Sequence, residues 1–131
     1  MIVYRVALPP THEGNHMGEW MGPYRGASES PNDDVREFAL RMAHAHNDNN
    51  HPTPWTDVPD GINYNEHCVF SDVDRINEWF KNFGHGLEDA GFMVVGYEVD
   101  ESDVRMGNRQ DVAVVSDDKI VSIESPLGYI H

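Results

Sequence analysis

The sequence predicts an α+β fold: a single compact domain over residues 1–131, with an antiparallel or mixed β core, two to three helices and two long ordered loops. Runs rich in Val, Ile, Tyr and Phe lie near both ends of the chain and favour strands. Apolar residues at helical spacing lie between these runs. The loops are expected at residues 11–29 and 47–66, which combine Gly or Pro with aromatic residues, and long loops of this kind often carry function.

Five segments are expected to form strands. Pro9 and Pro10 end the first of them, because proline cannot donate to a sheet ladder. Each later segment combines β-branched or aromatic residues with a nearby turn signal. The five segments are residues 2–8, 67–70, 92–99, 111–115 and 119–124.

The first helix is expected over residues 31–46. Ser30 suits the N-cap and Pro31 the first helical position, and two aspartates follow where the helix dipole favours negative charge. Its predicted buried face consists of Val35, Phe38, Met42 and Ala45.

A second helix is expected to begin at Ser71, which forms a Ser-x-x-Asp cap with Asp74, and to end near Phe80. A short third helix over residues 87–90 is expected to end at Gly91, which tolerates a left-handed backbone.

The charge of the chain is strongly acidic. Nine Lys and Arg residues stand against 23 Asp and Glu residues, which gives a formal net charge of −14. Such a surface repels nucleic acid and anionic membranes, so we expect neither as a direct partner. The carboxylates have two explanations: they favour solubility, or they meet a host protein that has a basic surface.

The location expected from the sequence is the cytoplasm. The single Cys68 excludes an internal disulfide. No stretch approaches the ~20 consecutive apolar residues of a membrane helix. The first segment resembles a strand that contains Arg5 rather than a signal peptide.

Metal and hydrolase chemistry are not predicted. His44 and His46 are two residues apart and so lie on different sides of a helix, while His67 and Cys68 alternate along a strand and point to opposite faces. Cys68 lies in an apolar run, and no Gly-x-Ser-x-Gly motif surrounds Ser71.

Three polar residues lie at predicted strand edges: Arg5 in the first strand, Ser71 after residues 67–70, and Gln110 before residues 111–115. This set resembles the ADP-ribosyltransferase superfamily. There an Arg or His on the first strand grips the nucleotide, a Ser after a central strand supports the ribose, and a polar residue at a late strand, usually Glu, orients the ribose and the nucleophile. The resemblance implies catalytic positions at Arg5, Ser71 and Gln110.

The same resemblance implies NAD or a related ADP-ribose nucleotide as cofactor. Arg5 and Arg25 would hold the pyrophosphate by bidentate bonds, and an aromatic ring would stack on a base. The implied binding residues are Tyr4, Arg5, Arg25, His51, Trp55, Ser71 and Tyr97.

Gln110 departs from the family pattern, because a glutamine can bond a ribose hydroxyl but cannot act as a base. Asp111 is expected to point to the other side of its strand, whereas Glu98 and Glu101 are near in sequence and could substitute. We therefore expect binding of the nucleotide to prevail over its turnover.

Short segments also resemble small uncharacterised proteins of bacteriophages and actinobacteria, and a phage anti-CRISPR protein of this fold. The segments are Gly22-Pro23-Tyr24-Arg25, His51-Pro52-Thr53-Pro54, Asp60-Gly61-Ile62, Cys68-Val69-Phe70-Ser71 and residues 97–104. This resemblance implies a phage protein that acts on a host factor or a nucleotide signal. The alternative is a non-enzymatic acidic protein, an inhibitor of the nucleic-acid-mimic type, that blocks a basic host defence protein.

Overall fold

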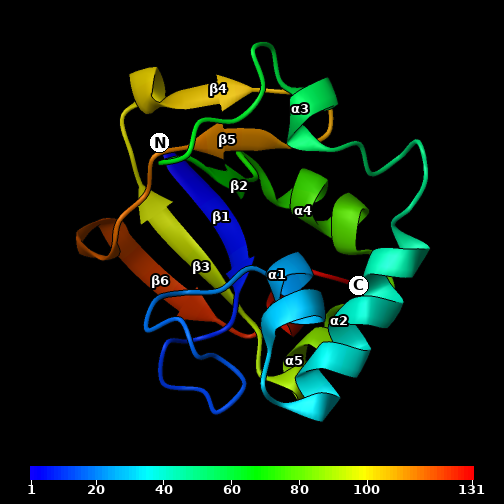
Figure 1. The fold of residues 1–131 in the computed structure, drawn as a ribbon. Helices are drawn as coiled ribbons and strands as arrows, with labels where there is room; N and C mark the ends of the chain where they lie inside the picture. The colour runs from blue at the N-terminus through cyan, green and yellow to red at the C-terminus, as the bar shows by residue number, and fades with distance from the viewer.

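Strands β1 and β2 lie at the centre of a six-stranded arrangement in the computed structural model, which describes residues 1–131 (Figure 1). One antiparallel sheet has the order β1-β3-β6 and the other β2-β5-β4. Backbone bonds of 2.8 Å in both directions between Tyr4 and Phe70 connect the two sheets. The strands are β1 (Ile2–Ala7), β2 (His67–Val69), β3 (Met93–Glu98), β4 (Val104–Met106), β5 (Asp111–Ala113) and β6 (Ile120–Glu124).

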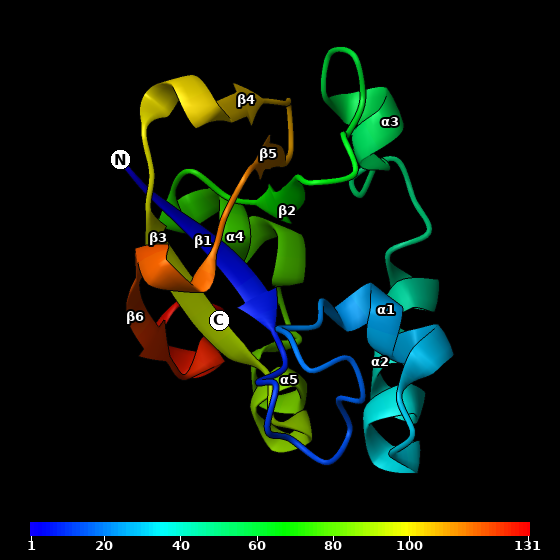
Figure 2. The ribbon, with the colours of Figure 1, turned by 60° about the vertical axis from the view of Figure 1, so that its left-hand side comes forward.

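The helices pack beside these sheets and complete the predicted α+β class. Helices α1 and α2 lie against each other, and α5 contacts α2, as the turned ribbon shows (Figure 2). No helix is long and apolar enough to cross a membrane. The helices are α1 (Pro23–Glu29), α2 (Asp33–Ala45), α3 (Pro54–Asp57), α4 (Val73–Phe80) and α5 (Gly84–Ala90).

The alternation of side chains along β1 divides the core in two. Val6 joins a cluster with Phe38, Phe70 and Phe80, where helices cover the sheet. Val3 points to the other face and joins a smaller cluster of buried residues. Arg5 lies two residues beyond Val3 and therefore shares its face, opposite to that of Val6.

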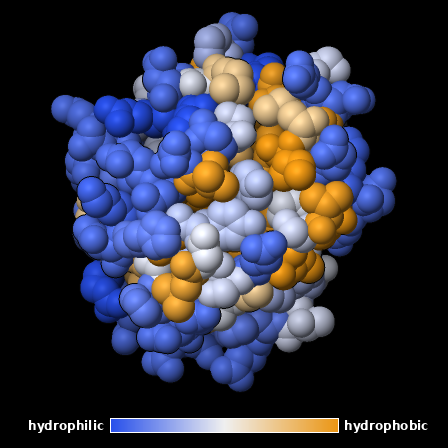
Figure 3. Space-filling view, turned by 180° about the vertical axis from the view of Figure 1, so that it is seen from behind, coloured by the Kyte–Doolittle hydropathy of each residue, from blue (hydrophilic) through white to orange (hydrophobic).

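Beyond this core, several large apolar side chains remain exposed. Val121 and Ile123 of the edge strand β6 are among them. Seen from behind, apolar atoms form separate patches within a mainly hydrophilic surface (Figure 3).

A buried ion pair joins the start of α4 to β5. Asp111 is fully buried and accepts two bonds of 2.9 Å from Nη1 of Arg75. Its carboxylate also accepts the backbone N–H groups of Ser71 and Gly107. The prediction that Asp111 points away from the face of Gln110 is confirmed, since Gln110 turns to a different set of partners described below.

Two predicted helix caps are wrong by one or two residues. The N-cap of α2 is Asn32, whose side chain accepts from the N–H of Val35, while Ser30 instead donates to the carbonyl of Gly14. The N-cap of α4 is Asp72, which accepts from the N–H of Arg75. In both cases a polar residue nearer to the helix competes successfully for the free N–H groups.

Short elements inside the predicted loops were not expected. Both α1 and α3 begin with a proline, whose fixed φ suits the first helical position. Strand β4 is not among the five expected strands, and its three residues are paired with β5. Ala45 is exposed rather than part of the buried face of α2.

The predicted end of α5 is confirmed, because Gly91 has φ of 99° and its N–H bonds back to the helix. A side chain at this position would also collide with the ring of His12, since an added Cβ would lie 2.5 Å from its Nε2.

We predict that Asp111→Asn lowers the free energy of unfolding by about 3 kcal/mol, because it leaves the Arg75 guanidinium without its counter-charge. Urea unfolding measures the change. The matched control is Asp74→Asn in the first turn of α4, where the carboxylate is exposed and the expected loss is below about 1 kcal/mol. Equal effects of the two substitutions would contradict this role for Asp111.

Candidate functional site

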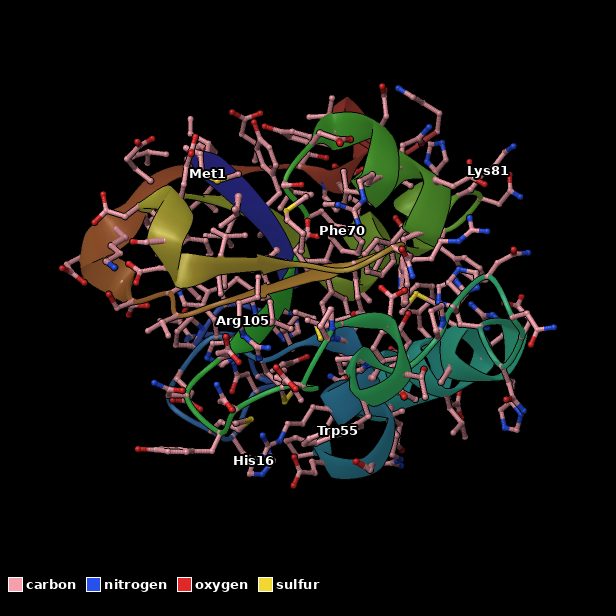
Figure 4. All side chains as sticks on the ribbon, turned by 90° about the horizontal axis from the view of Figure 1, so that it is seen from above. Met1, His16, Trp55, Phe70, Lys81 and Arg105 are labelled. Carbon is pink, nitrogen blue, oxygen red and sulfur yellow. The ribbon has the colours of Figure 1, made fainter.

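A large cavity of about 740 Å³ lies beside the central strands, between them and the α1–α2 pair. Its volume falls in the range of about 300–1,000 Å³ that is usual for small-molecule sites. Its walls come from β1, β2, α1, the C-terminal half of α2, the end of α4, the segment before α1 and the loop that follows α2. Phe70, which lines it, lies near the middle of the molecule in the view from above (Figure 4).

Arg5 brings a positive charge to this cavity. Its guanidinium donates one bond of 3.2 Å from Nη2 to the carbonyl of Trp20. No carboxylate lies within ion-pair distance of Arg5, although the chain has 23 Asp and Glu residues. The hydroxyl of Tyr97 also lies beside this guanidinium. The N–H groups that face neither Trp20 nor Tyr97 can bind an anion.

Gln110 forms another part of the lining and is only 3% exposed. Its Nε2 donates to the carbonyl of Pro52 at 2.7 Å, and its backbone N–H donates to the buried carboxylate of Asp57 at 2.9 Å. Its Oε1 accepts no bond within the protein, and no fully buried side-chain oxygen lacks a partner. This oxygen is thus a free acceptor at the cavity wall.

A pair of stacked histidines forms the end of the large cavity. The rings of His46 and His51 are parallel within 9° and 3.8 Å apart. His51 bonds Asp48 through Nδ1 at 2.8 Å and the carbonyl of Trp79 through Nε2 at 2.7 Å. Both partners are acceptors, so these two contacts hold the His51 ring in place through its N–H groups.

His46 is the neutral member of the stack. Burial and the neighbouring charge of His51 lower the pKa of His46 to about 4. Its Nδ1 accepts from the hydroxyl of Tyr24 at 2.6 Å, and that hydroxyl in turn accepts from the indole N–H of Trp79 at 2.6 Å. Burial of the hydroxyl raises the pKa of Tyr24, so it remains a donor.

Cys68 and His67 reach the cavity from β2. Burial raises the pKa of the Cys68 thiol to about 11, which makes the thiolate rare at neutral pH. Burial, assisted by the charge of Arg5, lowers the pKa of His67. Neither residue is prepared to act as a charged nucleophile or acid.

The carboxylates at the large cavity are Glu19 and Glu66. Glu66 is committed to Arg105, and this hydrogen bond lowers the pKa of its carboxyl. Glu19 has no cationic partner and is exposed at the cavity. Glu98 does not line the cavity: it lies at the end of β3 and pairs with the N-terminal amine. Glu101 is also absent from the lining and belongs to the 3-10 turn Glu101–Asp103.

The structure brings four of the sequence-predicted residues to the large cavity: Arg5, Arg25, His51 and Gln110. Tyr4 points to the opposite face of β1 and packs on Tyr129 at 5.4 Å between ring centroids. Tyr97 is buried in the smaller core cluster. These two aromatic residues serve the core.

The two other predicted residues lie apart from the large cavity. Ser71 accepts from Arg75 at the start of α4. Trp55, labelled in Figure 4, is 67% exposed on α3, and its ring covers Gly61. The contact between Tyr24 and His46 spans 22 residues and leaves no local pattern, so it could not be predicted from the sequence.

Metal ligands are not gathered anywhere in the chain: no three His, Cys, Asp or Glu side chains lie close enough together to hold an ion. The histidines at the cavity instead stack or bond to neutral groups and carboxylates.

Fold and site define a small α+β domain with one large ligand-sized cavity beside its central strands. A family model described as Bacteriophage T4 Y00F protein matches residues 1–126, so the chain belongs to this bacteriophage protein family. No curated protein and no solved structure matches it.

We predict that protonation of His46 destabilises the fold in acid. The pKa of His46 in the folded protein, about 4, lies below the ordinary value of 6.5. The contribution of neutral His46 to the free energy of unfolding is therefore complete above pH 6.5 and is lost as the pH falls towards 4. The loss reaches about 3 kcal/mol. Unfolding free energies between pH 7 and pH 4 measure it.

His46→Gln should flatten this pH dependence, whereas His44→Gln, two residues earlier and exposed, should keep it. Some acid sensitivity remains in His46→Gln, because the pKa of His67 is lowered as well. A pH profile identical to that of the wild type would exclude His46 as its source.

Proposed function

We propose that this phage protein binds NAD or a related ADP-ribose nucleotide in the large cavity. The observation that carries the proposal is the pairing of a carboxylate-free Arg5 with the free Oε1 of Gln110 at the walls of one cavity. A pyrophosphate and a ribose hydroxyl are the complementary groups of such a nucleotide.

Arg5 would hold the pyrophosphate, because a guanidinium fork matches two phosphate oxygens. Arg25 at the mouth would assist, although its Nε now bonds Glu29 at 2.6 Å along α1. That pair is exposed, and an exposed pair is worth at most about 1 kcal/mol, so a bound phosphate can replace Glu29 as its partner.

The aromatic surface for a base would come from Tyr24 and Trp20, which line the large cavity. Tyr24 is held by its two hydroxyl contacts while its ring stays 40% exposed. A ring fixed in this way stacks on a base at little entropic cost. His51 lines the same cavity, with both ring nitrogens already bonded to Asp48 and Trp79.

The site would bind the nucleotide without efficient turnover, because it lacks a suitable carboxylate next to the ribose. Cleavage of the nicotinamide bond develops positive charge on the ribose, which a carboxylate stabilises and an amide does not. Gln110 occupies the position where the resembled family usually has Glu, and Asp111 is committed to Arg75. The protein would therefore sequester a nucleotide in the host cytoplasm rather than consume it.

The second candidate is the acidic interaction protein that blocks a basic host protein. It is supported by the net charge of −14 and by the exposed carboxylates of the 3-10 turns Glu101–Asp103 and Asp117–Lys119. Charge reversal at Asp118, which does not line the large cavity, would weaken such a complex, whereas nucleotide binding would keep its affinity.

We predict that Arg5→Gln weakens binding of ADP-ribose by about tenfold to a hundredfold, because it removes the charge-assisted bonds to phosphate. Calorimetric titration measures the affinity. Arg41→Gln is the matched control, since Arg41 also lacks a carboxylate but lies over the ring of Phe38, outside the cavity. Equal affinity of the Arg5→Gln variant and the wild type would remove Arg5 from the site.

We further predict that Gln110→Glu lowers the free energy of unfolding by about 2 kcal/mol, because a carboxylate cannot donate to the carbonyl of Pro52. Loss of this bond would displace the loop at Pro52, which also forms a wall of the site. We therefore expect no gain in nicotinamide release from NAD in this variant. An active Gln110→Glu enzyme would show that only the missing charge prevents turnover. Gln110→Met is the control that removes the donor without adding charge.

A further inference from the structure

A second cavity of about 320 Å³ lies next to the large one and is lined by basic residues. Arg75 and Lys81 reach it from α4 and its C-cap, and Arg109 reaches it from the turn before β5. Figure 4 places Lys81 at the periphery of the molecule, so this cavity is open to solvent on that side. Glu78 is the one carboxylate in its lining.

The distribution of unpaired cations singles out this cavity. Five of the nine Lys and Arg residues form ion pairs with carboxylates, which leaves Arg5, Arg41, Lys81 and Arg109. Arg5 lines the large cavity, and Lys81 and Arg109 line the second. Three of these four unpaired cations therefore lie at two adjoining cavities, in a chain of net charge −14.

The two cavities share one wall, formed by His46, His51 and Trp79. Both ring nitrogens of His51 are engaged within the protein, so this residue offers no free donor to either cavity. A ligand in the large cavity that extends past this wall would bring an anionic group to Lys81 and Arg109.

We propose that the second cavity binds a phosphate group, and this proposal rests in part on the proposed nucleotide site. Arg75 already donates to Asp111 and to the carbonyl of Gly107, so its role is structural and it is not counted among the phosphate ligands. Lys81 has no partner, and Arg109 has only a bond of 3.4 Å to the amide oxygen of Asn50.

Together Lys81 and Arg109 offer a point charge and a planar fork to one group, which is the arrangement that fits the several oxygens of a phosphate. The volume of the cavity lies at the lower end of the usual range of small-molecule sites, about 300–1,000 Å³, and it is large enough for a phosphate with its waters. The phosphate has two possible sources: an additional phosphate ester on the bound nucleotide, or a separate phosphate.

The test titrates the full chain calorimetrically with NAD, with NADP and with inorganic phosphate, at one fixed ionic strength. NADP is the same nucleotide with one further phosphate ester. We expect NADP to bind at least about tenfold more tightly than NAD, and the double variant Lys81→Gln/Arg109→Gln to lose this preference without loss of NAD affinity. Both side chains are exposed, so the variant should unfold like the wild type, and Arg41→Gln should keep the preference.

The other outcomes separate the sources. Binding of inorganic phosphate with amide NMR shifts at Lys81 and Arg109, abolished in the double variant, supports a separate phosphate even when NADP and NAD bind equally. Phosphate shifts at these residues without any nucleotide binding would refute the proposed function and leave the phosphate site standing. Equal affinity for NAD and NADP together with no phosphate shifts would overturn the phosphate site.

Discussion

The buried ion pair between Asp111 and Arg75 is the constraint on which the rest of the site depends. It fixes β5 against the start of α4, and the same carboxylate fixes the backbone of Gly107 in the preceding turn. Since side chains alternate along a strand, directing Asp111 towards α4 directs Gln110 the other way, towards the loop at Pro52. A structural charge pair thus orients the neighbouring amide at the cavity wall.

The loop after α2 shows how a long irregular segment becomes a wall of definite shape. Asp57 accepts the N–H groups of Arg109 and Gln110, both at 2.9 Å, and His51 is tied to the end of α4. Each contact joins residues about 30 to 50 positions apart, which stabilises the loop through tertiary bonds rather than local propensity. Loss of the bond between His51 and the end of α4 would alter both cavities, because His51 lines the wall between the two cavities.

Much of the fold could be predicted from periodicity. The strand alternation and the apolar spacing of α2 and α4 are local signals, and Gly91 ended α5 as expected. The helices α1 and α3 have seven and four residues, and β4 has three, so their signals are too short to stand above the loop pattern. Arg5 and Gln110 could be predicted as site residues from their positions at strand edges. The Tyr24–His46 contact was not, because nothing in either segment specifies the other.

The acidity of the chain is compatible with an anionic ligand because distance decides which charges matter. Exposed carboxylates act over about 8–10 Å before salt screens them, whereas a guanidinium in a partly desolvated cavity acts at contact distance and is screened much less. Arg5 lines the large cavity and forms no ion pair with a carboxylate, and the same holds for Lys81 and Arg109 in the second cavity. The surface charge would then slow the approach of anions in general, while the few unpaired cations determine which anion stays bound.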